Sequence, residues 1–217
     1  MLTSLLKNLC LSSLLIIALS SCSPTLGYKF KRVEGVTSAN IHTIINKDNS
    51  LLYKAQIKLY NGYFSGLIIL KQIDSVTSHL VFVTELGMKM FDFKIQNGEL
   101  ELVFVFAPLN KPKIIKMLKS DMKLILLQHL LNRNADVFEK PDGQQYIYKI
   151  QNEKFKNYYF INSVNKTVDK ILVKGNFCKK EKVDYIYDET LISKQIKLRH
   201  KGFIRLQIEL NNISKNY

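Results

Sequence analysis

The chain has no tryptophan, and it has only three cysteines, four prolines and nine glycines among 217 residues. Scarce proline and glycine, with 47% hydrophobic and 23% charged residues, exclude collagen-like, low-complexity and largely disordered chains. Arginine occurs only four times, so lysine supplies the other 28 of the 32 basic residues. Sites that grip nucleic acid in a fixed geometry favour the planar arginine fork, so the net charge of +14 indicates a solvated basic surface and no nucleic-acid partner.

Motifs of catalysis and metal binding are missing as well. No GxSxG, HExxH, CxxC or glycine-rich phosphate loop occurs. The histidines are far apart in the sequence and have no partner at ligand spacing. Two pairs of strand carboxylates, Asp184 with Asp188 and Glu99 with Glu101, are expected on solvated polar faces. We therefore expect no enzyme active site, no metal and no cofactor other than covalently attached lipid.

The first 21 residues have the pattern of a signal peptide that is cleaved off. One charge, Lys7, precedes an apolar run from Leu11 to Leu19, which is too short for a comfortable membrane span. The letters LSSC at positions 19–22 resemble the bacterial lipobox, in which the cysteine becomes the new N-terminus and carries acyl chains such as palmitate. Cleavage before Cys22 leaves 196 residues with a net charge of +13, because Lys7 is lost.

Lipidation of Cys22 predicts a protein that is anchored to a membrane without spanning it. Cys10 leaves with the signal, so Cys178 is expected to be an inert thiol with no partner for a disulfide. The next residues, 23–25, lack the aspartate that retains proteobacterial lipoproteins in the inner membrane. Surface-exported lipoproteins of the Bacteroidetes tend to have acidic residues just after the cysteine, whereas the first acidic residue here is Glu34. We expect the periplasmic face of the outer membrane.

One domain, residues 37–217, is expected to follow a lipidated tether at 22–36. Apolar and polar residues alternate through most of it, which predicts a mainly β fold: a single curved antiparallel sheet of about eleven strands that forms a half-open barrel. Turns are predicted at Asn61-Gly62, Asn97-Gly98 and Lys201-Gly202. In the strand at 99–106, alternation puts Leu100, Leu102, Phe104 and Phe106 on one face.

One stretch, about 110–131, follows a helical period instead. Pro112 suits a first turn, and Ile114, Leu118 and Met122 belong to an apolar stripe. Either one bent helix or two short helices, with a restart at Ser120-Asp121, fits this pattern. The helical insertion would cover the concave apolar face of the curved sheet.

A covered apolar face is either a packed core or a cavity that holds an acyl chain. The residues expected to line such a cavity are apolar positions of the central strands and of the insertion. They are Ile57, Leu59, Phe91, Phe93, Leu102, Phe104, Ile114, Leu118 and Met122.

Residues 82–93, FVTELGMKMFDF, resemble the hairpin of the LolB-like outer-membrane lipoprotein receptors, part of the LolA/LolB lipoprotein-localisation superfamily. In that family a strand ends in a Pro-Leu-Gly turn; here Glu85 replaces the proline, while Leu86 and Gly87 match. The strand at 194–199 and the order of elements between Tyr53 and Leu210 are also similar, and the resemblance points to a Bacteroidetes-type member.

The resemblance implies that Leu86 and Gly87 form a membrane-insertion loop. The alternative is that Leu86 is an ordinary core residue packed beneath the helical insertion. It further implies a monomer that takes an acylated lipoprotein from a LolA-like periplasmic carrier and inserts this cargo among outer-membrane phospholipids. One alternative is a structural or accessory envelope lipoprotein of the same fold that binds a protein partner or another lipid. Another is a lipid-processing hydrolase, for which no clustered acid, base or nucleophile is seen.

Overall fold

The computed structural model describes residues 31–33, 41–42, 44, 50–130, 135–151, 155–175, 179–200 and 205–214. Within them, thirteen strands form one antiparallel sheet in the order β1-β7-β8-β9-β10-β11-β12-β13-β2-β3-β4-β5-β6. The strands are β1 (Lys31–Val33), β2 (Leu51–Leu59), β3 (Gly62–Gln72), β4 (Thr77–Thr84), β5 (Lys89–Gln96), β6 (Glu99–Val105), β7 (Asp136–Glu139), β8 (Gln145–Gln151), β9 (Lys156–Asn162), β10 (Val168–Lys174), β11 (Lys179–Tyr187), β12 (Ser193–His200) and β13 (Leu206–Asn212). A 3-10 turn, η2 (Ala107–Leu109), and the helix α2 (Pro112–Ile125) separate β6 from β7.

The expected mainly β fold with one open antiparallel sheet is confirmed, but the sheet has thirteen strands rather than about eleven. The two unforeseen strands are the shortest: β1 lies inside the stretch expected to be tether, and β7 follows the expected helical insertion. They pair with each other, and Arg32 forms an ion pair with Asp136 at 2.9 Å. Three or four residues are too few for alternation to be visible in the sequence.

Two of the predicted hairpin turns can be compared with the structure. Asn97 and Gly98 both have positive φ, 52° and 78°, as the tight turn that matches strand twist requires. The β2–β3 turn is formed by Tyr60 and Asn61, one residue earlier than expected, because Gly62 already pairs with Leu59. The turn predicted at 201–202, the signal segment, Cys22 and Cys178 all lie outside the described residues.

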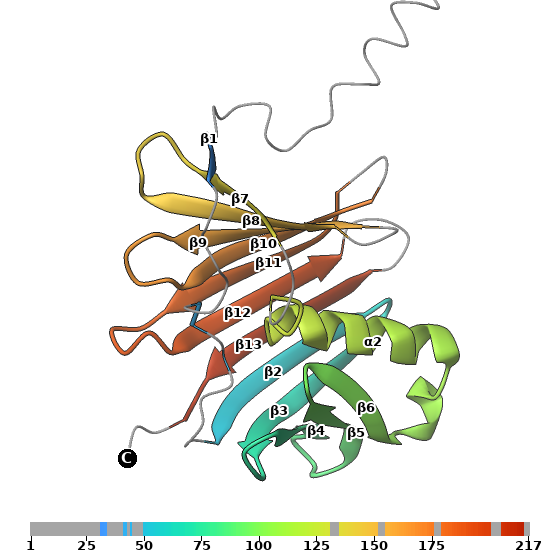
Figure 1. Ribbon diagram of the computed structural model, residues 1–217. Helices are drawn as coiled ribbons and strands as arrows, with labels where there is room; N and C mark the ends of the chain where they lie inside the picture. The colour runs from blue at the N-terminus through green and yellow to red at the C-terminus, as the bar shows by residue number, and fades with distance from the viewer. Residues whose placement is uncertain are drawn as a thin grey trace, which may run out of the picture.

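The helix α2, the one α-helix among the described residues, lies across the concave side of the sheet (Figure 1). Ser120 and Asp121 lie inside this helix, so they do not start a second one in the described part of the chain. The helix ends at Ile125, earlier than the predicted 131, and Leu127 follows in a left-handed conformation with φ 59°. Its buried side includes Met117, Leu118, Met122, Leu124 and Ile125.

The apolar side chains on the helix-covered face form one continuous core. Strand register explains this: residues paired across neighbouring strands point to the same side, so Ile57 lies beside Ile208 and Phe93 beside Leu80. The other face of the central strands is polar, with Lys54, Gln56 and Lys58 on β2 alternating with the core residues.

One predicted face is wrong, and a β-bulge is the reason. Phe93 pairs with Leu102 and Asp92 pairs with Phe104, which leaves Val103 as an extra residue on β6. An extra residue reverses the alternation, so Phe104 points to the opposite side from Leu100 and Leu102. Phe104 is 41% exposed, and the Lys89 ammonium lies 5.8 Å from its ring centroid. Phe104 therefore does not line the helix-covered face.

In the described part of the chain, no helix is both long enough and apolar enough to cross a bilayer.

Because of the bulge, Phe93 on β5 is buried while Phe104 on the adjacent β6 is partly exposed. The two phenylalanines are therefore a matched pair for a stability test. Phe93 is fully buried, so Phe93→Ala should lower the free energy of unfolding by about 3–5 kcal/mol. Phe104→Ala should lower it by less than about 1 kcal/mol, because the ring is already partly in water. Urea unfolding of both variants measures the difference, and equal losses would contradict the reversed face.

Candidate functional site

The β4–β5 hairpin holds one leucine almost completely in solvent. Leu86 is 94% exposed, so it does not pack in the core. Gly87 follows with φ +79°, and a Cβ built on it would meet nothing within 4 Å. The tip therefore stands clear of the rest of the described structure.

Hydrogen bonds fix the backbone around this leucine. The Thr84 and Gly87 amides donate to the Met88 and Thr84 carbonyls, each at 2.9 Å. The Glu85 amide donates to the Ser65 carbonyl, and the Ser65 hydroxyl donates to the Glu85 carboxylate at 2.6 Å. A proline at position 85 would lack that amide, so glutamate adds two contacts to β3 that the Pro-Leu-Gly turn does not have.

The remaining residues expected to line a cavity lie between α2 and the sheet. Ile57, Leu59, Phe91, Phe93, Leu118 and Met122 are all at most 9% exposed, and they belong to the same core cluster. Leu102 and Ile114 are half-buried against that cluster. These six side chains are packed as core, so an acyl chain would reach them only if this core opened.

Polar contacts also join α2 to the sheet. The Tyr185 hydroxyl on β11 lies 3.1 Å from the carbonyl oxygens of both Leu124 and Ile125, at the end of the helix. These carbonyls belong to the last turn, which has few intrahelical donors, so the tyrosine anchors the helix end. Burial raises the pKa of Tyr185 well above its usual value, so the hydroxyl stays protonated and able to donate.

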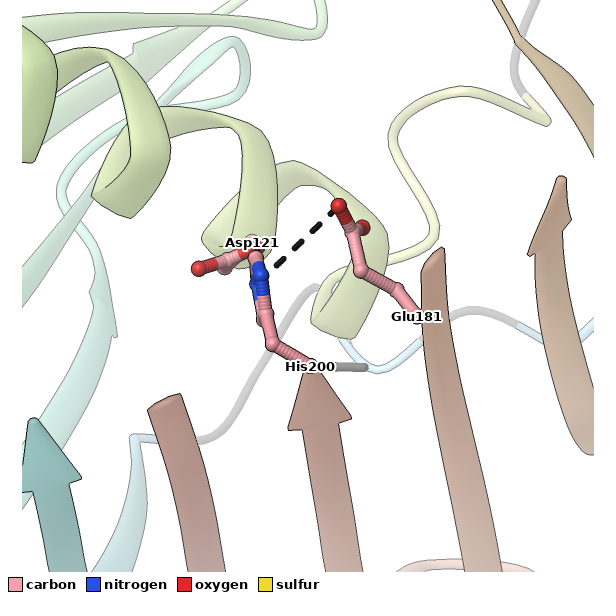
Figure 2. Close-up of side chains that lie close together, drawn as sticks. All are labelled: Asp121, Glu181 and His200. Atoms are coloured by element: carbon pink, nitrogen blue, oxygen red, sulfur yellow. Dashed lines mark hydrogen bonds and ion pairs between the residues drawn. The ribbon is translucent and has the colours of Figure 1, made fainter. Parts of the chain in front are cut away.

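A second polar contact is a cluster of three ionisable side chains beneath α2 (Figure 2). Asp121 comes from the helix, Glu181 from β11 and His200 from β12. His200 Nε2 lies 2.8 Å from Asp121 Oδ1 and 4.0 Å from Glu181 Oε1. The Asp121 side chain is fully buried, while those of His200 and Glu181 are 9% and 14% exposed.

Burial and mutual charge shift the pKa of each group in the cluster. Burial, reinforced by the charge of Asp121, raises the pKa of Glu181 to about 7. Burial also raises the pKa of Asp121, although the hydrogen bond from His200 opposes it. Burial alone would lower the pKa of His200, but the hydrogen bond to Asp121 and both carboxylate charges outweigh it and raise the pKa. The cluster therefore retains protons near neutral pH and is poised to exchange them or to bind a cation.

Sequence reasoning missed this cluster because its members are up to 79 residues apart. A local signal was present in two of the three elements. Asp121 falls on the buried stripe of α2, four residues after Met117. His200 continues the buried alternation of Ile196 and Leu198 on β12. A polar residue at a position where the pattern expects a buried apolar one indicates a buried polar contact. The sequence does not show which three such residues meet.

The four strand carboxylates that were expected on solvated polar faces follow this expectation in part. Asp184 lies on the outer face beside Lys182, whose ammonium is 2.6 Å away, and Glu101 is exposed. Glu99 forms an ion pair with Lys123 of α2. Asp188 lies after β11, in a turn, where its side chain accepts hydrogen bonds from the Thr190 and Ile192 amides.

The raised pKa of Glu181 predicts a pH-dependent stability. The folded state binds this proton up to about pH 7 and the unfolded state only up to about 4.5, so stability should fall as pH rises through that interval. His200, also raised, adds a loss in the same direction. Glu181→Gln stays neutral, so it should be more stable than the wild type above pH 7 by about 1–3 kcal/mol, a gain that shrinks toward pH 4.5.

Urea unfolding at several pH values between 4.5 and 8 measures this difference. Glu101→Gln makes the same change on the exposed edge strand and is the matched control. Parallel stability curves for Glu181→Gln and the wild type would contradict the assignment.

Comparison with known proteins gives similarity in fold alone. No family model matches the sequence, and no curated protein matches it. The structure is similar to the crystal structure of a LolA superfamily protein from Nitrosomonas europaea, with 7% identity over 80% of this chain and 90% of the other and a TM-score of 0.49. It is also similar to an outer membrane lipoprotein-sorting protein domain from Vibrio parahaemolyticus, with 7% identity over 76% of this chain and 84% of the other and a TM-score of 0.44.

Proposed function

We propose that this protein is anchored through acyl chains on Cys22 to the periplasmic face of the outer membrane. There it accepts acylated lipoproteins from a periplasmic carrier beneath α2 and inserts them into the membrane. The observation that carries the proposal is Leu86, an apolar side chain that a hydrogen-bonded hairpin holds 94% in solvent. The protein would act by binding and transfer, without enzymatic chemistry.

An exposed leucine gains free energy by entering a bilayer. Complete burial of one leucine side chain is worth about 1.5–3 kcal/mol, which is too little to hold a free protein on a membrane. A lipid anchor changes this balance, because the tether keeps the hairpin close to the surface at a high effective concentration. Leu86 can then dip into the membrane repeatedly without trapping the protein there.

The helix-covered face suits the cargo's acyl chains. Each buried CH₂ group is worth about 0.8 kcal/mol, so a long chain that replaced α2 against Phe91 and Phe93 would offset much of the cost of moving the helix. The core side chains on the sheet would then pass from contact with α2 to contact with the acyl chain. Transfer between two apolar surfaces in this way would avoid exposing the chain to water.

The basic surface fits a position beside anionic lipid. Lysines near such a surface contribute up to about 1 kcal/mol each. Lys89, directly after the Leu86 turn, has a half-exposed side chain and lies on the outer face with Phe104. Charge and apolar surface thus occur together at this hairpin.

Leu86→Glu should abolish delivery while leaving uptake intact, because a charge at the tip resists entry into the bilayer and the tip does not contact the core. A fluorescent triacylated lipopeptide serves as cargo. Its binding to the protein measures uptake, and its transfer to vesicles of phosphatidylethanolamine and phosphatidylglycerol measures delivery. We expect transfer to fall at least tenfold and binding to change less than twofold.

Val164→Glu is the matched control, since Val164 is 88% exposed in the turn between β9 and β10. It introduces the same charge at another apolar tip and should leave transfer unchanged. Wild-type transfer by Leu86→Glu would refute the role of the hairpin, and equal loss in both variants would refute its specificity.

A second test concerns lipid binding itself. The Cys22→Ala chain, secreted with a conventional signal in place of residues 1–21, should be released from the membrane and carry or take up acyl-chain ligands. Native mass spectrometry detects such a ligand as a mass increase that organic extraction removes. A protein that stays empty after incubation with the lipopeptide would favour the accessory-lipoprotein alternative, in which the same fold binds a protein partner.

A further inference from the structure

The three side chains beneath α2 have a use that lipid transfer does not require. Asp121, Glu181 and His200 come from three different elements, and one donor atom from each lies within 4.8 Å of the others (Figure 2). Such convergence needs the folded tertiary structure, since two of the donors are on adjacent strands and the third is on the helix above them. We propose that these three side chains bind one divalent transition-metal ion, with zinc the best fit.

The separations between donors suit a single small ion. Ligand atoms bound to zinc at about 2.0–2.2 Å lie roughly 3–3.5 Å apart in a tetrahedral site. The observed separations of 2.8 Å and 4.0 Å from His200 Nε2 lie on either side of this value. Small rotamer changes at Glu181, the most exposed of the three, would bring its oxygen into range.

An unsatisfied oxygen shows that the ion pair alone does not complete the cluster. Asp121 Oδ2 is buried and has no hydrogen-bond partner in the described structure, although Oδ1 contacts His200. A buried carboxylate oxygen without a partner is costly. A cation that this carboxylate holds through both of its oxygens would compensate for the orphaned oxygen as well as for the charge.

Charge balance leads to the same conclusion. Two ionised carboxylates and a neutral imidazole carry a charge of −2, which one divalent ion neutralises. Lys180, the neighbour of Glu181, does not replace such an ion, because its ammonium lies over the Phe155 ring, 4.5 Å from the centroid. On binding, the ion displaces the protons held by the cluster, and these protons pass to the buffer.

The donor set selects among metals. An imidazole nitrogen with two carboxylate oxygens suits zinc and related transition metals, whereas magnesium and calcium prefer oxygen ligands alone. Three protein ligands leave a fourth position for water or an external group. An ion bound here would also cross-link α2 to β11 and β12.

The test uses the full wild-type chain in detergent micelles, stripped with EDTA and returned to chelator-free buffer. Calorimetric titration with zinc chloride should show one equivalent bound in the micromolar range or tighter, with proton release that varies with the ionisation heat of the buffer. Excess zinc should raise the midpoint of thermal unfolding by roughly 5–10 °C. Magnesium chloride should produce neither effect.

Variants identify the site. Glu181→Gln and His200→Gln should each weaken zinc binding at least tenfold and reduce the thermal shift. The control is His79→Gln, which removes another histidine–aspartate contact, His79 Nδ1 to Asp92 Oδ1 at 3.0 Å on the outer face. This variant should bind zinc like the wild type. Glu181 is partly exposed, so its variant is expected to fold, and cooperative unfolding without metal verifies this.

Absence of saturable zinc binding by the wild type would overturn the proposal. Wild-type affinity in folded Glu181→Gln and His200→Gln would overturn it as well, since the zinc would then bind elsewhere. Neither result would affect the proposed transfer of lipoproteins, which is measured through Leu86 and through acyl-chain binding.

Discussion

An open sheet with one apolar face must cover that face, and in the described part of the chain α2 and the turns on either side of it do so. The two ends of the thirteen-stranded sheet do not meet, so closure into a barrel does not hide the apolar side chains. Met117, Leu118 and Met122 of α2 pack against them instead. Because α2 contributes several large apolar side chains to this core, its displacement would expose apolar area, and only another apolar molecule could replace the helix at comparable free energy.

Polar groups within this apolar contact determine how α2 lies on the sheet. Leucine and methionine tolerate small shifts, whereas the Tyr185 hydroxyl reaches the helix only at the carbonyls of its last turn. The contact between Asp121 and His200 fixes a second point, one turn earlier. Two such points define both the position and the rotation of the helix. They also give the contact a dependence on protons that purely apolar packing would lack.

Much of the fold could be predicted from the sequence, because period two and period 3.6 are local properties. The strands β2 to β6 and the helix insertion follow from them. The reversal at Phe104 could not be predicted, since the bulge at Val103 depends on how β6 fits β5. Nor could the pairing of β1 with β7, which joins two short segments distant in sequence. The meeting of Asp121, Glu181 and His200 required the complete topology for the same reason.

The exposed hairpin and the helix contact place opposite demands on one chain, and the structure separates them. In the proposed function, Leu86 remains in water until it meets a membrane, which requires a rigid turn. The bonds from Ser65 and Thr84 to that turn are local to β3, β4 and β5. The same proposal has the helix leave the sheet, which requires contacts that can be exchanged. Its buried polar contacts lie on β11 and β12, which are separated from β4 by β13, β2 and β3 in the sheet order. A further ion pair joins Lys123 of the helix to Glu99 of β6, which pairs with Gln96 at the end of β5 opposite the Leu86 turn. In the proposed function, α2 would therefore move without loosening the hairpin, and the hairpin would enter a bilayer without moving the helix.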